Sequence, residues 1–308
     1  MMFRRLTCFA LPLLLWTSAC SASSIFYLTP TPTPYIYPTA ETPSYAPLSM
    51  EALQNAEYTL PGFGGATHAC QLKDGKYSLG DPSVSGYVSL SMLDFFAFGD
   101  LNKDGVNDAA VLIAENDGGT AVFVSLNAVL NEGGLPRHAA SYLVDDRPQI
   151  NKLDIRDGEI FLDAVVHSFD DPACCPELSV TRSFELRGMS LMLVHATSRL
   201  PDGQERTITI DSPINGAEMR GEVVITGSVT IAPFENTLTY YVYNEQGNEL
   251  FVGPIQVDAV DFGEAGTFEA MLDIGTYPTG RLWIVVADLS AADGSVLALD
   301  SVEVVVQQ

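Results

Sequence analysis

Short apolar runs separated by glycine- and aspartate-rich turns dominate the chain from residue 49 onward. Their length and their frequent period of two indicate strands rather than helices. An Asp157-Gly158 turn predicts a hairpin between two of these runs. Between residues 49 and 205 we expect antiparallel strands on both sides of an acidic loop at 100–108, and also at 76–79, 86–90, 120–126, 139–144, 150–155, 160–167, 179–186 and 191–197.

A few stretches of this first region depart from the strand pattern. Ser49 can cap a helix at 50–57, with Met50, Leu53 and Ala56 on one face. Residues 58–69 are rich in glycine and predict a loop, and residues 127–131 tolerate a helix. We therefore expect a β-rich α+β domain at 49–205.

A second domain is expected at 206–308, after a hinge at 200–204. Seven strands in about a hundred residues is an immunoglobulin-like count, so the fold class is mainly β, with a β-sandwich at the C-terminus. The predicted strands are 207–210, 222–229, 238–243, 249–257, 267–272, 281–287 and 296–306.

The N-terminus has the pattern of an export signal. Arg4 and Arg5 precede an apolar run at 6–16, which is too short to span a bilayer. The run and the following Ala19-Cys20 resemble a bacterial lipoprotein signal peptide at 1–20, in which Cys20 would be lipidated. Cleavage after Ala19 as an ordinary secretory signal is the alternative, since Thr17-Ser18-Ala19 is also a small-x-small site. Residues 21–48, rich in Pro, Thr and Ser, predict an extended linker.

The net negative charge of the chain excludes nucleic acid as a partner. The chain has 15 Lys and Arg against 39 Asp and Glu, a net charge of −24. Such a chain is repelled by phosphate backbones and by anionic lipid, so we expect no nucleic acid partner and membrane attachment only through a lipid anchor. The simplest explanation of the acidic charge is that it keeps a secreted protein soluble.

Candidate metal chemistry gathers in the loop at 100–108. Asp100, Asn102, Asp104 and Asp108 take positions 1, 3, 5 and 9, with a glycine at position 6. This spacing surrounds a hard cation such as calcium with oxygen atoms. Position 12 is Val111 rather than a glutamate, so the loop is no EF-hand.

The loop and the preceding Phe98-Gly99 resemble FG-GAP/integrin-type and dockerin-like repeats. The resemblance implies calcium bound by those four side chains and by the carbonyl of Val106. An empty turn with solvated carboxylates is the alternative. A single copy of the loop argues against a propeller.

Cysteines offer further candidate chemistry. In an oxidising compartment we expect Cys70 to pair with Cys174 or Cys175, leaving one thiol over. A bond between the adjacent Cys174 and Cys175 is the less favoured pairing. A zinc site of His167, Cys174 and Cys175 is a further alternative that lacks an obvious fourth ligand.

Catalytic patterns are sparse in the sequence. The four histidines are isolated, and no Gly-x-Ser-x-Gly or phosphate-binding glycine loop is present. His167 with Asp170 and Asp171 is the one candidate acid/base cluster. The alternative is that His167 is only a histidine at the end of a strand, beside a polar turn. A secreted hydrolase with its site in residues 49–205 is therefore an alternative function.

Two resemblances bear on function. Residues 171–176, with their Cys-Cys-Pro turn, resemble a poorly characterised domain of bacterial secreted lipoproteins, from which no activity follows. Ile210-Asp211-Ser212-Pro213-Ile214-Asn215-Gly216, Ile225-Thr226-Gly227, Gly266-Thr267-Phe268 and Ala292-Asp293-Gly294 resemble the immunoglobulin-like domain of bacterial spore-germination proteins.

The second resemblance implies an interaction module without catalytic residues. We therefore expect a lipid-anchored, non-enzymatic binding or envelope-assembly protein on the extracellular or periplasmic side of the cell membrane. Its partner would be a protein or a glycan of the envelope or the extracellular space. An extracellular solute-binding lipoprotein, with an apolar cavity between its domains, is the remaining alternative.

Overall fold

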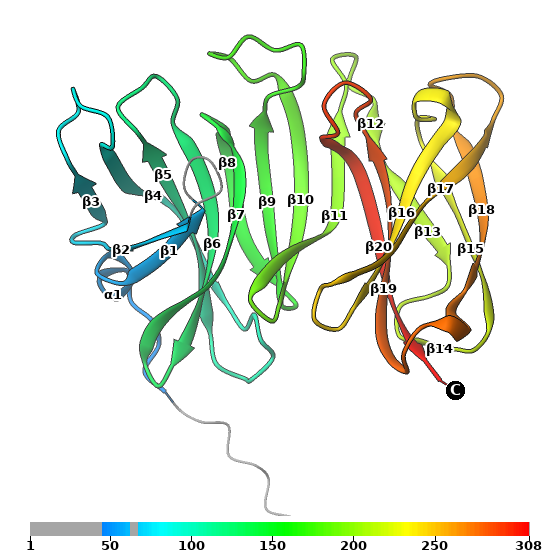
Figure 1. Cartoon of the computed structure of the whole chain (residues 1–308), viewed down its shortest axis with the longest axis horizontal. Coiled ribbons are helices and arrows are strands. Elements are labelled where there is room, and N and C mark those ends of the chain that lie inside the picture. The colour runs from blue at the N-terminus through cyan, green and yellow to red at the C-terminus, as the bar shows by residue number, and fades with distance from the viewer. Residues whose placement is uncertain (1–44, 62–66, 308) are drawn as a thin grey trace, which may run out of the picture. The chain divides into compact units, whose positions relative to one another are not determined.

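The computed structural model describes residues 45–61 and 67–307. They belong to one compact unit, Thr42–Gln308. The predicted signal peptide with Cys20, and the linker as far as residue 44, lie outside the described residues. Within these two described ranges, the elements are β-strands apart from one short helix and two 3₁₀ turns (Figure 1), so the mainly β prediction is confirmed.

The N-terminal part of the described chain, residues 45–206, forms three layers. A central antiparallel sheet lies between a small layer of one helix and one hairpin and a second antiparallel sheet. The small layer is α1 (Met50–Gln54), β1 (Glu57–Pro61) and β2 (Thr67–Gln71). The central sheet, in spatial order, is β3 (Lys76–Leu79), β4 (Val88–Gly99), β5 (Asp108–Asn116), β6 (Phe123–Glu132) and β7 (Leu135–Asp146). The other sheet has β8 (Gln149–Arg156), β9 (Glu159–Val166), β10 (Leu178–Arg187) and β11 (Ser190–Arg199), with β12 (Glu205–Arg206) paired to β11.

Strand β5 is buried on both faces, which explains why its sequence is apolar without alternation. Ala109, Val111 and Ile113 pack toward α1, β1 and β2. Ala110 and Leu112 pack toward β9 and β10. A strand buried on both faces needs apolar residues at successive positions rather than at every second one.

Several local predictions need correction. The helix ends at Gln54, although Ser49 caps it as expected by accepting a hydrogen bond from the N–H of Ala52 (3.1 Å). Within the stretch expected as a loop at 58–69, all described residues belong to the hairpin β1–β2. Residues 127–131 lie in β6, because burial between two layers overrides their tolerance for a helix. Residues 200–204, expected as a hinge, form the turn between β11 and β12.

The C-terminal sandwich, residues 208–306, confirms the seven expected strands. One sheet contains β13 (Ile208–Ser212), β15 (Glu222–Val229) and β18 (Gly266–Asp273), and the other contains β16 (Thr237–Asn244), β19 (Gly280–Leu289) and β20 (Val296–Val306). β17 (Glu249–Ala259) pairs with β16 along most of its length and with β18 at its end, so it connects the two sheets. A short β14 (Ala217–Met219) runs parallel to β20.

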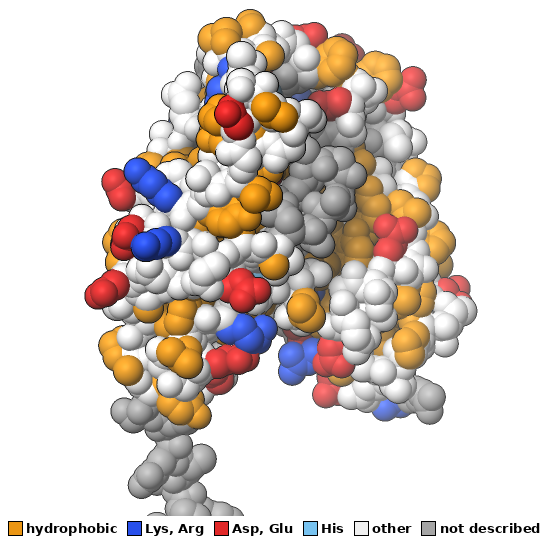
Figure 2. All heavy atoms as spheres, turned by 60° about the vertical axis from the view of Figure 1, so that its left-hand side comes forward, with side chains coloured by type: hydrophobic (Ala, Val, Ile, Leu, Met, Phe, Trp, Pro, Cys, Tyr) orange, Lys and Arg blue, Asp and Glu red, His pale blue; other side chains and the backbone are white. Residues whose placement is uncertain are grey.

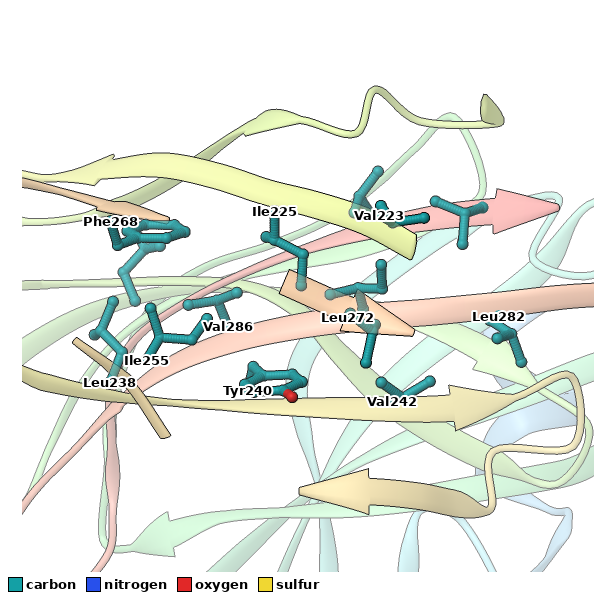
Figure 3. Packing of buried hydrophobic residues seen from close by; sticks show 14 of the residues in the cluster. Val223, Ile225, Leu238, Tyr240, Val242, Ile255, Phe268, Leu272, Leu282 and Val286 are labelled. Atoms are coloured by element: carbon teal, nitrogen blue, oxygen red, sulfur yellow. The ribbon is translucent and has the colours of Figure 1, made fainter. Parts of the chain in front are cut away.

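The sandwich core lies between these sheets. Figure 3 shows Ile225 and Phe268 from one sheet facing Tyr240, Leu282 and Val286 from the other. The Phe268 ring packs so closely on Gly227 that an added Cβ there would lie 2.3 Å from its Cζ. Packing against Phe268 therefore requires the glycine of the Ile225-Thr226-Gly227 motif.

One contact continues the sheet from the N-terminal part into the sandwich. Strands β11 and β20 pair antiparallel at His195 with Asp300 and at Ala196 with Leu299. The Ser301 hydroxyl donates to the carbonyl of Val194 (2.8 Å). We call this contact, at residues 194–196 and 299–301, the seam.

Buried groups support the seam on both sides. Ala196, Val285, Ala287 and Leu299 form a small apolar cluster there. Nearby, Arg206 donates to the buried carboxylate of Asp288 (2.6 Å). Burial outweighs the guanidinium and raises the pKa of Asp288, so removal of Arg206 would leave a costly buried charge.

Leu112 provides a test of the three-layer core. Replacing this fully buried side chain in Leu112→Ala removes its contacts and leaves a cavity, and we expect the free energy of unfolding to fall by about 2–5 kcal/mol. The measurement is the denaturant midpoint. Leu143→Ala makes the same chemical change at a side chain that is 50% exposed and should cost far less. Equal losses for the two variants would contradict the described layering.

Candidate functional site

The acidic loop lies between β4 and β5, at the end of the central sheet. Its backbone folds back through left-handed conformations at Lys103 (φ 62°) and Gly105 (φ 87°). Glycine adopts such angles without strain, which is why position 6 of the loop is glycine. The chain thereby turns Asp100, Asn102 and Asp104 toward the backbone of their own loop.

Hydrogen bonds within the loop hold these three side chains. Asp100 accepts from the N–H of Asp104 through Oδ1 (3.1 Å) and from the N–H of Gly105 through Oδ2 (2.8 Å). Asn102 Oδ1 also accepts from the N–H of Asp104 (3.1 Å), and Asp104 Oδ1 accepts from the N–H of Val106 (2.8 Å). The predicted ligands therefore share one turn that they stabilise themselves.

Asp108 has a different position from the other three. Its side chain is fully buried. Oδ2 accepts from the N–H of Leu101 (2.9 Å), and Oδ1 accepts from the N–H of Asn131 in β6 (2.8 Å). Burial raises its pKa although both hydrogen bonds favour the charged form. Asp108 thus joins the loop, β5 and β6.

The chemistry of the donors fits calcium. Three carboxylates, one amide oxygen and the Val106 carbonyl are hard oxygen ligands, and a carboxylate oxygen that accepts one hydrogen bond keeps a second lone pair. Among the described residues, however, no group of three or more His, Cys, Asp or Glu side chains is arranged to hold a metal ion. Calcium at this loop stays a prediction.

The cysteine prediction needs correction. Cys70 is a free thiol in β2, buried beside Tyr58, and burial raises its pKa to about 11. Cys174 and Cys175, exposed in the turn before β10, are bonded to each other. The expected bond from Cys70 is wrong in this structure, because Cys70 points into the core between the hairpin and the central sheet. The two sulfurs of the turn bond each other, so they do not form a zinc site with His167.

His167 has an acidic neighbour that the sequence did not suggest. Its Nδ1 lies 2.9 Å from Asp145 Oδ2, whereas Asp171 accepts from the N–H and hydroxyl of Ser168. The expected cluster of His167 with Asp170 and Asp171 is therefore replaced by a His167–Asp145 pair. Asp145 lies at the end of β7. No spacing in the sequence indicates that it meets His167, because the contact depends on how the strands pack.

A cavity of about 660 Å³ opens beside β3 and β4. Lys73, Lys76, Ser78, Ser89 and Ser91 are among the residues that line it. Its volume is in the range of small-molecule sites, roughly 300–1,000 Å³. No sequence pattern indicated it, because its polar residues are scattered over β2, β3, β4 and β5 without a common spacing.

Comparison with known proteins identifies the C-terminal sandwich. Residues 207–295 match the family described as "Immunoglobulin-like domain of bacterial spore germination". The expected immunoglobulin-like domain is confirmed. The family suggests a non-enzymatic extracellular module. The matched residues lie entirely within the C-terminal part of the chain.

Other comparisons add little. A search of curated proteins found no match. Among solved structures, the chain has a distant similarity to the crystal structure of the extracellular domain of the putative one component system BT4673 from B. thetaiotaomicron. The two are 8% identical with a TM-score of 0.21, over 69% of this chain and 37% of that one. Our chain thus spans little more than a third of that structure's length. Within residues 45–61 and 67–307, no helix is long and apolar enough to cross a membrane.

Asp108 can be tested separately from calcium. In the presence of a calcium chelator, we expect Asp108→Asn to lower the free energy of unfolding by about 1–3 kcal/mol. The asparagine amide has only one oxygen, so it cannot accept hydrogen bonds from both buried N–H groups as the carboxylate does. Chemical denaturation measures the change. Asp104→Asn, at an exposed residue of the same loop, is the matched control and should cost clearly less. A larger loss at Asp104 would show that the loop is not held through Asp108.

Proposed function

We propose that the protein is a lipid-anchored display protein of the cell membrane, facing the extracellular or periplasmic side. The observation that carries the proposal is the C-terminal sandwich, which matches an immunoglobulin-like family of bacterial spore germination over residues 207–295. Such a sandwich offers exposed sheet faces and loops for binding rather than a catalytic cleft. Its role is non-enzymatic binding or envelope assembly, with a protein or glycan partner.

The surface agrees with display in an aqueous compartment. Figure 2 shows acidic and basic side chains interspersed on the face it presents, with hydrophobic side chains between them. From residue 206 to the end, the sandwich region carries 15 acidic residues and 3 arginines, a net charge of −12. This charge disfavours contact with an anionic lipid surface, so a tether at Cys20 with the 21–48 linker would hold the protein near the membrane without adsorption.

The acidic loop would have a structural role in this proposal. Calcium bound by Asp100, Asn102, Asp104, Asp108 and the Val106 carbonyl would offset the repulsion among three carboxylates. It would hold β4 against β5 in the calcium concentrations found outside cells. The proposed binding role does not itself use the calcium ion.

Lipidation can be tested by cell fractionation. In the host cell we expect the Cys20→Ala protein to leave the membrane fraction, because the thioether anchor cannot form. Cys8→Ala, a cysteine-to-alanine change within the same signal, should leave the protein in the membrane. Retention of the Cys20→Ala protein in the membrane after a high-salt wash would contradict the lipid anchor.

Calcium can be tested by titration calorimetry and thermal melting of the chelator-treated protein. At a calcium concentration of about 100 Kd, we expect stabilisation by about 2.7 kcal/mol and a higher Tm. Asp104→Ala should abolish both the heat and the shift. Asp258→Ala removes an exposed carboxylate of β17 and should preserve them. A native protein that gives neither heat nor a Tm shift would remove the calcium proposal and leave the display role untouched.

A further inference from the structure

The cavity of about 660 Å³ lies against one face of the central sheet. β3 is the edge strand of that sheet, with β4 and β5 next to it (Figure 1). Directly paired residues on neighbouring strands point to the same face. Two rows of paired residues cross the three strands and line the cavity: Lys76, Ser91 and Ala114, and then Ser78, Ser89 and Asn116. This face of the sheet is therefore polar.

Two lysines stand directly opposite each other at this cavity. Lys73 and Lys76 exchange both of their backbone hydrogen bonds (2.8 and 3.1 Å), so their side chains share one face. Asp74 and Gly75 between them have φ angles of 50° and 75°, as in the tight turn of a β-hairpin. The carbonyl of Gly75 accepts from the N–H of Met92 in β4 (2.8 Å), which fixes the turn to the sheet. The backbone therefore holds both lysines at the cavity.

The opposition of these two charges has a cost. Like charges directly opposite each other on paired strands destabilise a sheet. Both lysines are exposed, and neither forms an ion pair within the described residues, whereas Lys152 pairs with Asp154 (3.2 Å). The chain has four lysines and a net charge of −24, so half of its lysines gather at one cavity. Such a local excess of positive charge calls for an anionic group from outside the chain.

The acidic residue of the lining belongs to the opposite face. Among the described residues that line the cavity, Glu115 is the only acidic one. Side chains alternate along a strand, so Glu115 points away from its neighbours Ala114 and Asn116 in β5. It is 6% exposed, whereas those neighbours are half-buried. Burial and then the charge of Glu115 raise the pKa of the Cys70 thiol in β2, which agrees with this placement. The open side of the cavity is therefore positive.

Hydroxyl groups on the same face are available to a ligand. Ser78 is exposed and Ser91 is half-buried, and neither hydroxyl has a hydrogen-bond partner among the described residues. Ser89 makes one long hydrogen bond to the carbonyl of Asn116 (3.4 Å). Each hydroxyl can donate one hydrogen bond and accept two. A ligand with several hydroxyl groups of its own matches this set.

Other ligand classes fit this cavity less well. A metal ion is repelled by the two ammonium groups, and the described residues place no three His, Cys, Asp or Glu side chains together to hold one. An apolar molecule would leave the lysines and the hydroxyls without partners. A long polyanion is repelled by the rest of the chain, because of its strong net negative charge. A small anion that carries hydroxyl groups remains.

We propose that this cavity binds a small sugar that carries one anionic group. The anionic group lies between Lys73 and Lys76, and the ring hydroxyls exchange hydrogen bonds with Ser78, Ser89 and Ser91. The inference goes beyond the display role, because the site belongs to the N-terminal part rather than to the sandwich that carries that role. It stands whether or not Cys20 is lipidated or calcium binds.

Titration calorimetry of the full-length protein tests the ligand class. Glucuronate and glucose 6-phosphate, titrated separately, distinguish a carboxylate from a phosphate as the anionic group. We expect saturable binding of at least one of them, weakened by added salt because the lysines are exposed. Glucose, which lacks the charge, and acetate or inorganic phosphate, which lack the ring hydroxyls, should each bind at least about tenfold more weakly. Binding of neither anionic sugar, or equal binding of glucose or of the matching simple anion, would overturn the proposal.

Substitutions of single lysines locate the ligand. Lys73→Gln and Lys76→Gln should each weaken binding of the anionic sugar about tenfold or more, since each removes a charged donor. Lys152→Gln makes the same change at an exposed lysine of β8, outside the cavity, and should leave the affinity unchanged. Without ligand, Lys76→Gln should be at least as stable as the native protein in chemical denaturation, because the repulsion between the two lysines is removed. A weaker affinity then reports the site rather than unfolding, and an unchanged affinity in both cavity variants would overturn the site.

Discussion

The pairing of β11 with β20 is the contact on which the described unit depends. Two residue pairs, a serine hydroxyl and a small apolar cluster continue the sheet of the N-terminal part into the sandwich. Backbone groups at a sheet edge need partners, and each strand here supplies them to the other. The same contact brings a buried arginine of β10 over a tryptophan of β19. A polar cavity of about 180 Å³ beside this contact is lined by residues of both parts, so neither part would enclose it alone.

Buried charge recurs beside this contact. Arg206 with Asp288 and Arg187 with Glu185 each place a guanidinium against a carboxylate at low exposure. Such pairs add little net stability, but the loss of one partner is costly. Arg206 and Asp288 belong to different parts, so their pair favours one arrangement of the two parts, whereas Glu185 and Arg187 lie on the same strand. The apolar layers supply most of the free energy of folding.

The acidic loop uses its polar side chains in two ways. Asp100, Asn102 and Asp104 accept hydrogen bonds from the backbone of their own loop. Asp108, from a buried position, accepts from the N–H of Leu101 and from the N–H of Asn131 in β6, so it joins the loop to β6. The turn is therefore stabilised by its own hydrogen bonds and by its attachment to the neighbouring strand.

The strand-rich class, the seven strands of the sandwich and the acidic turn could be predicted from the sequence, because period, turn residues and loop spacing are local properties. Ser49 could be predicted as a helix cap for the same reason. Three outcomes depended on packing: residues 127–131 form a strand, Cys70 is buried away from Cys174, and Asp145 rather than Asp170 meets His167. Those outcomes depend on which distant segments pack together. The contact of Arg187 with Trp283 is the clearest case, since the two residues lie on strands of different parts and no sequence spacing relates them.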